Sequence, residues 1–120
     1  MNINHLNLVV ENVAETAHFF VTYFEFEQTI MKGENVIAVL RNKENFTLVL
    51  STDKTGNNHY PKDFHIGFML NSQEQVDKTY EALKSGGVEP GRVPGKIRNS
   101  YAFYFHFDTI FIEVGYYFAS

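Results

Sequence analysis

Two histidines and one glutamate have the residue types and the spacing to hold a metal ion. His5 and His65 lie in matching segments, His-Leu-Asn-Leu and His-Ile-Gly-Phe, sixty positions apart. Glu113 lies in the last apolar run, between Ile112 and Val114, where a buried carboxylate is costly unless something compensates its charge. Two imidazoles and one carboxylate form a ligand set that leaves open positions for water or substrate. We therefore predict one divalent ion per chain (Mn²⁺, Ni²⁺, Fe²⁺ or Zn²⁺), held by His5, His65 and Glu113.

Each of these residues also has an ordinary explanation. A single histidine on a strand is more often a hydrogen-bonded residue than a ligand, and a glutamate on a terminal strand more often faces water. Their matching positions in a repeat favour the metal site over these explanations. The other histidines lack such positions: we expect His18 on a helix surface, His59 in a loop and His106 at the surface near a strand end.

The strands that would carry the two histidines each have one apolar face. Successive side chains of a strand point to opposite faces. Along residues 5–10, alternation separates His5 from the leucines, and along residues 63–70 it separates His65 from Phe64 and the other large apolar side chains. We expect the apolar face of each strand to pack beneath a helix and the histidine face to line the site.

The elements that must position these residues form two similar halves. In the first half, a strand is followed by a helix capped by Asn12, and then by predicted strands at 27–31, 35–41 and 45–51. In the second half, a strand is followed by a helix that begins at Asn71-Ser72 and ends at Gly86-Gly87, then by a short strand and long loop in 88–99, and by strands at 101–107 and 110–117. We predict an α+β fold, a single domain of two βαβββ modules (1–51 and 63–118, joined by loop 52–62) whose curved mixed sheets surround a central cavity.

Composition narrows the class of protein. The chain has 120 residues, of which 44% are hydrophobic, with 12 Phe and 7 Tyr, so it can bury a core. A net charge of −4 gives no reason to expect a nucleic acid as partner. Without cysteine, disulfides and thiolate metal sites are excluded. No apolar run has membrane-spanning length and no secretion signal precedes the first strand, so we expect a cytoplasmic protein with no membrane partner.

The paired modules, with His5, His65 and Glu113 at their strand positions, resemble the vicinal oxygen chelate superfamily. This group includes glyoxalase I, bleomycin resistance proteins, fosfomycin-modifying thiol transferases and extradiol dioxygenases. Segments 83–88 and 111–114 are similar to its usual signatures. The resemblance implies a metal-dependent enzyme acting on a small oxygen-chelating metabolite, as a lyase, isomerase, oxygenase or thiol transferase. It also implies a homodimer whose metal sites are shared between chains.

Some residues qualify this expectation. Glyoxalase I takes a further carboxylate from the last strand of module one. Aligning segment 46–49 with segment 111–114 puts Leu48 there, with Thr47 as the alternative. Since neither is an acid, we do not expect classical glyoxalase I activity. Asn7 and Tyr101 are candidate substrate contacts, and no residue is identified as a general base.

Two alternatives to an enzyme remain open. A protein of the same fold could sequester an antibiotic or another small molecule without turnover, as metal-free bleomycin-binding relatives do with an acidic, aromatic cleft. A family fold could also keep a vestigial site. Stoichiometric metal binding would separate the enzyme from both alternatives.

Overall fold

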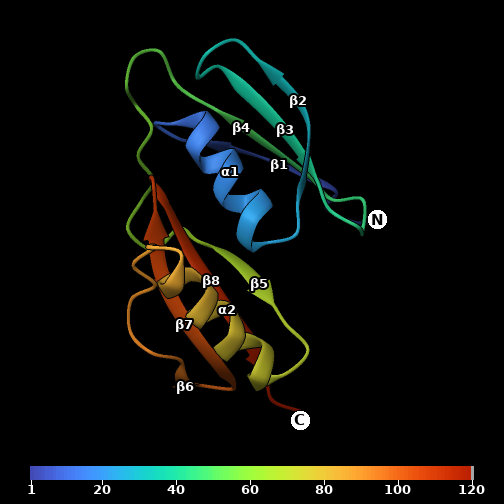
Figure 1. Cartoon of the computed structure of the whole chain (residues 1–120), viewed down its shortest axis with the longest axis vertical. Coiled ribbons are helices and arrows are strands. Elements are labelled where there is room, and N and C mark those ends of the chain that lie inside the picture. The colour runs from blue at the N-terminus through green and yellow to red at the C-terminus, as the bar shows by residue number, and fades with distance from the viewer. Residues whose placement is uncertain (120) are drawn as a thin grey trace. The chain divides into compact units, whose positions relative to one another are not determined.

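The computed structural model describes residues 1–119, which divide into two compact units. The first unit is Met1–Tyr60 and the second begins at Pro61. Each unit contains one helix and one four-stranded mixed sheet, and in each the helix covers one face of its own sheet (Figure 1). The prediction of an α+β fold with two βαβββ modules is therefore confirmed.

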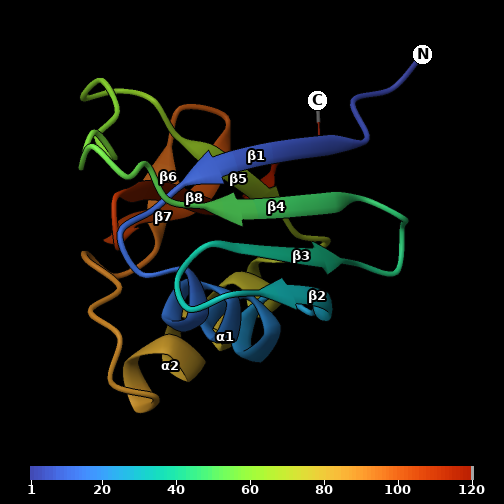
Figure 2. The same ribbon diagram turned by 90° about the horizontal axis from the view of Figure 1, so that it is seen from above.

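In the first unit, the two strands furthest apart in sequence are parallel neighbours. Its elements are β1 (His5–Val9), α1 (Val13–Tyr23), β2 (Glu27–Lys32), β3 (Ile37–Arg41) and β4 (Thr47–Ser51). The strand order is β1-β4-β3-β2, with β1 parallel to β4 and the other pairs antiparallel. Figure 2 shows α1 along one face of this sheet. The helix begins after Asn12, whose side-chain oxygen accepts a hydrogen bond from the Glu15 N–H at 2.9 Å.

The second unit repeats this arrangement. Its elements are β5 (Ile66–Met69), α2 (Gln73–Ser85), β6 (Gly95–Ile97), β7 (Ser100–Phe107) and β8 (Ile110–Tyr117). The order is β5-β8-β7-β6, with β5 parallel to β8. The Ser72 hydroxyl accepts a hydrogen bond from the Gln75 N–H and so caps the start of α2. The helix ends at Gly86, followed by Gly87 at φ +85°, as the glycine pair predicts.

The core of each unit lies between its helix and its sheet. Apolar side chains from both elements are at most 2% exposed. The largest of them are Leu8, Phe19, Phe20, Leu40, Leu48 and Leu50 in the first unit, and Leu83, Phe103, Ile110 and Ile112 in the second. Transfer of such side chains out of water contributes about 1.5–3 kcal/mol each. The predicted apolar faces therefore supply the packing that holds each sheet against its helix.

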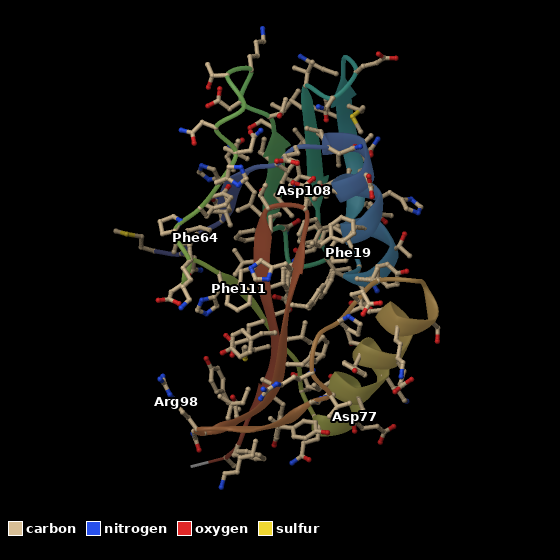
Figure 3. The ribbon with its side chains drawn as sticks, turned by 90° about the vertical axis from the view of Figure 1, so that its left-hand side faces the viewer. Phe19, Phe64, Asp77, Arg98, Asp108 and Phe111 are labelled. Carbon is tan, nitrogen blue, oxygen red and sulfur yellow. The ribbon has the colours of Figure 1, made fainter. Side chains whose placement is uncertain are left out.

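The start of the second unit differs from the prediction. The strand begins at Ile66 instead of Asp63, because residues 61–64 form a turn in which the Phe64 N–H donates to the Pro61 carbonyl at 3.1 Å. Phe64 consequently leaves the predicted helix-facing row and is 40% exposed. Figure 3 shows Phe64 on the side of the second sheet opposite Asp77 of α2.

Within residues 1–119, neither the length nor the apolar character of any helix suffices to cross a membrane.

Candidate metal centre

The second unit brings two of the three predicted ligands together. His65 lies immediately before β5, and Glu113 lies on the neighbouring strand β8, where it pairs with Gly67. The His65 Nε2 atom is 3.3 Å from Glu113 Oε1. The Glu113 carboxylate lies over Gly67, where a Cβ atom would make an ordinary van der Waals contact of 3.5 Å with the same oxygen. The parallel pairing of β5 with β8 therefore places one imidazole and one carboxylate side by side.

Glu113 is a nearly buried carboxylate. Its side chain is 12% exposed, whereas that of His65 is 40% exposed. An ionised carboxylate in such a place requires a compensating charge or several hydrogen bonds. The imidazole of the pair is therefore accessible to a ligand, while the carboxylate is largely shielded from water.

The orientation of the His65 ring determines which atom faces Glu113. The ring Nδ1 is 2.9 Å from the Asp63 carbonyl oxygen, which can only accept, so Nδ1 carries the hydrogen. In the neutral ring, Nε2 then has no hydrogen and is an acceptor that lies next to a carboxylate oxygen. Two acceptors at 3.3 Å repel each other unless a cation lies between them. Either a proton on Nε2 or a metal ion bound to both atoms would satisfy the arrangement.

The donor set fits a divalent metal. Imidazole nitrogen and carboxylate oxygen bind Zn²⁺ and similar ions at about 2.0–2.2 Å, so two ligands of one ion lie about 3 Å apart. The Asp63 carbonyl holds the ring as the outer partner of a metal-bound histidine usually does. Within residues 1–119, no group of three or more His, Cys, Asp or Glu side chains is placed to hold an ion; His65 and Glu113 are two residues of these types side by side.

His5 belongs to the first unit and is exposed at the start of β1. Its Nδ1 atom is 2.8 Å from the Asn4 side-chain oxygen. Asn7, two residues further along, is also exposed, and its amide donates to the Ser51 hydroxyl at 3.1 Å. Both side chains therefore remain accessible on the face of β1 opposite the buried Leu8.

An aromatic wall stands beside the His65–Glu113 pair. The Tyr104 and Phe111 rings have their centroids 5.8 and 5.9 Å from that of His65, each in an edge-to-face arrangement. Tyr104 is the direct cross-strand partner of Glu113. Burial, together with hydrogen bonding to Glu113, raises the pKa of Tyr104 to about 12. The phenol therefore keeps its proton at neutral pH and can donate a hydrogen bond.

The tyrosine of β7 that lies beside Glu113 is Tyr104, whereas the predicted substrate contact was Tyr101. Tyr101 lies on the opposite face of β7, where its hydroxyl donates to Asp77 of α2 at 2.6 Å, and this hydrogen bond raises the pKa of Tyr101. Tyr101 therefore lies on the helix side of the sheet, away from the face that carries Glu113. A signal for Tyr104 was present: counting back from the two-residue turn at Asp108-Thr109 pairs Tyr104 with Glu113.

The strand registers also correct the alignment of the two modules. Glu113 pairs with Gly67, and the equivalent pair in the first unit is Asn7 with Val49. Leu48 is 2% exposed and belongs to the helix-facing row. The first-unit position that corresponds to Glu113 is therefore Val49, which again is not an acid.

The remaining histidines lie at the surface, as predicted. His18, His59 and His106 are all exposed. The His106 ring stacks on Phe111 with 4.5 Å between centroids, so it contacts the aromatic wall from the side.

Comparison with known proteins agrees with this architecture. The sequence matches the family model described as Glyoxalase/Bleomycin resistance protein/Dioxygenase superfamily over residues 2–112. A possible glyoxalase from Bacillus cereus is 38% identical, with a TM-score of 0.81 over 95% of this chain and 97% of that chain. No curated protein matches the sequence significantly.

More distant structures share the fold alone. A glyoxalase/bleomycin resistance protein/dioxygenase from Nocardioides is 18% identical, with a TM-score of 0.80 over 100% of this chain and 85% of that chain. The genomically encoded fosfomycin resistance protein FosX from Listeria monocytogenes is 19% identical, with a TM-score of 0.78 over 97% of this chain and 93% of that chain.

Proposed function

Because the chain belongs to the glyoxalase/bleomycin resistance protein/dioxygenase superfamily, we propose that it is a metal-dependent enzyme acting on a small metabolite whose adjacent oxygens chelate the ion. The observation that carries this proposal is the pair of facing acceptors, His65 Nε2 and Glu113 Oε1 at 3.3 Å. A metal ion bound to both atoms would remove the repulsion between them and compensate the charge of the nearly buried carboxylate, which a proton on Nε2 would otherwise do. We propose one Mn²⁺, Ni²⁺, Fe²⁺ or Zn²⁺ ion per chain.

In this proposal, each residue near the ion has a separate role. His65 and Glu113 hold the ion, and the Asp63 carbonyl keeps the His65 ring in the tautomer that offers Nε2. When bound, such an ion polarises the oxygens of a chelated substrate. Tyr104, with its pKa near 12, donates a hydrogen bond and holds its proton at neutral pH. Its ring and that of Phe111 exclude water from one side of the pair.

We further propose that His5 is the third protein ligand and that the working unit is a homodimer in the cytoplasm. His5 begins the strand that is equivalent to β5, so its position in the repeat matches that of His65. In the dimer, His5 of one chain would join the partner subunit's His65 and the partner subunit's Glu113. Asn7, accessible two residues beyond His5, is the proposed substrate contact of the first unit.

Calorimetric titration of metal-free protein with Mn²⁺, Ni²⁺, Fe²⁺ and Zn²⁺ tests the proposal. We expect saturable binding of at least one of these ions at about one per chain. His65→Ala and Glu113→Gln should each weaken it by more than the 10- to 100-fold that loss of an outer partner typically costs. His106→Ala is the matched control, since His106 is an exposed histidine that touches Phe111 without facing Glu113.

Absence of saturable binding for every one of these ions would overturn the metal-dependent function and favour a protein that binds its ligand without a metal. Equal losses in His106→Ala and His65→Ala would instead show that general destabilisation causes the effect.

A further inference from the structure

A second feature of the second unit is a pocket at the β6 edge of its sheet. Its volume is about 300 Å³, and its walls come from the loop before β6, from β6 itself and from the middle of β7. β6 pairs with β7 only as far as Ala102, so the pocket lies where this pairing stops. Gly95 is one of the lining residues, and a Cβ atom there would meet nothing within 4 Å.

The loop that forms one wall is anchored at Gly91. The Tyr80 hydroxyl, from α2, donates to the Gly91 carbonyl at 3.2 Å. On the β7 side, a Cβ atom at Gly91 would lie 2.5 Å from the Tyr104 carbonyl oxygen, and the residue has φ +74°. Only glycine combines this backbone conformation with so close an approach. The pocket wall next to Arg92 is therefore held against the sheet.

The charge of the pocket is opposite to that of the whole chain. Arg92 and Lys96 line it, no acidic residue does, and the chain carries a net charge of −4. Lys96 Nζ lies 6.0 Å from the centroid of the Phe118 ring. Among residues 1–119, the ion pairs are His65–Glu113 and Lys78–Glu74, so neither cation of the pocket is neutralised by a described carboxylate.

The rest of the lining is apolar or aromatic. Val93 and Ile97 offer aliphatic surface, and Tyr104 adds a ring. Val93 is 70% exposed and Ile97 39% exposed, so a ligand with an apolar body would remove both from water. A guanidinium binds a carboxylate through two parallel hydrogen bonds, and an ammonium adds a third donor.

From this combination we propose that the pocket is a binding site for a small apolar carboxylate, such as an aryl-substituted acid. The carboxylate would meet Arg92 and Lys96, and the apolar body would cover Val93 and Ile97. The site needs no metal ion and shares only Tyr104 with the metal centre. It therefore stands or fails independently of the proposed function.

Two-dimensional amide NMR of the metal-free protein tests the site, with phenylacetate as the probe. We expect saturable shifts at Gly91, Gly95 and Ala102, with a Kd on the order of 1 mM for a ligand of this size. Phenylacetamide has the same shape without the charge and should bind at least about tenfold more weakly. Inorganic phosphate, which lacks an apolar body, should also bind more weakly.

Two kinds of variant test the charge of the pocket and its free volume separately. The double variant Arg92→Gln/Lys96→Gln should weaken phenylacetate about tenfold or more, because it removes both charged donors. Gly95→Val adds a side chain at a lining residue, where a Cβ atom would meet nothing within 4 Å, and it should weaken phenylacetate binding with both cations present. Lys62→Gln/Lys84→Gln is the matched control, since it removes two exposed charges from the same unit outside the pocket.

Three results would overturn the proposal. They are equal affinity for phenylacetate and phenylacetamide, equal loss in the control double variant, and no saturable shifts at millimolar phenylacetate. Metal titration of Arg92→Gln/Lys96→Gln should match that of the unmodified protein, which keeps the two sites distinguishable.

Discussion

Glu113 is held 3.3 Å from an imidazole nitrogen that, in the neutral ring, cannot donate to it. We expect Glu113→Gln to raise the free energy of unfolding of metal-free protein by about 1 kcal/mol, because the amide donates where the carboxylate repels. Urea denaturation at alkaline pH, where imidazole is neutral, measures the change. A stability below that of the unmodified protein would show that Glu113 is favourably paired without a metal.

Because the pKa of Tyr104 is raised by folding, the free energy of unfolding should fall at alkaline pH. The pKa of the phenol is raised from 10.0 to about 12 in the folded protein, mainly by burial and then by Glu113. A pKa raised by folding contributes stability that is fully present below the unfolded value and is lost as the pH rises through the folded value. The contribution of Tyr104 should therefore be lost between pH 10 and about 12.

Phenolate absorbance of unmodified protein and Tyr104→Phe gives the direct measurement. The difference between the two titration curves should have its midpoint near pH 12. A midpoint near the ordinary value of 10 would mean that Tyr104 is neither buried nor bonded to Glu113.

Val49 occupies the first-unit position that corresponds to Glu113. We expect isomerisation of the methylglyoxal–glutathione hemithioacetal to be very weak, because valine supplies neither a ligand nor a proton shuttle. An assay of metal-loaded protein, with an established glyoxalase I as reference, measures this. Efficient turnover would show that another residue replaces the missing acid.

At the scale of elements, the loop between α2 and β6 depends on one glycine. Gly91 and Gly56 both have positive φ, but a Cβ atom at Gly91 would meet Tyr104 while one at Gly56 would meet nothing within 4 Å. Gly56→Ala should cost about 1 kcal/mol for the left-handed backbone alone. Gly91→Ala should cost about 1–3 kcal/mol more, from overpacking against β7.

Chemical denaturation of the two variants compares these costs under identical conditions. Equal losses of unfolding free energy would mean that the loop moves away from β7 without cost. The conclusion that Gly91 holds the pocket wall against the sheet would then be wrong.

At the scale of the whole molecule, the proposed shared site makes a specific claim about mixed dimers. His5→Ala and Glu113→Ala homodimers should each bind metal weakly, because every site has lost one ligand. In their heterodimer, both lesions fall in the same composite site, so the other site keeps His5, His65 and Glu113. We expect mixed dimers to recover about one tightly bound ion per dimer.

Refolding the two variants together and measuring bound metal in the isolated heterodimer tests this claim. Mixed dimers that recover no metal binding would show that each site is built within one chain.

Local sequence determined the elements of this protein and much of its candidate site. Asn12 and Ser72 mark the helix starts, because each side chain accepts a hydrogen bond from the backbone N–H three residues later. Alternation along each strand separates the side chains that face the helix from those on the other face of the sheet. The repeat of βαβββ modules then places His5 and His65 at equivalent positions in the two modules. These signals act over a few residues, so they are readable without the fold.

Only the tertiary structure decided which side chains stand beside Glu113. A shift of one residue in strand pairing reverses every side chain between the two faces of a sheet, and pairing depends on hydrogen bonds between distant segments. It gave Glu113 the neighbour Tyr104 instead of Tyr101, and placed Val49 instead of Leu48 at the equivalent position. The short distance between His65 Nε2 and Glu113 Oε1 has the same origin, because β5 and β8, whose paired residues are 46 positions apart, must be hydrogen-bonded before either atom has a partner.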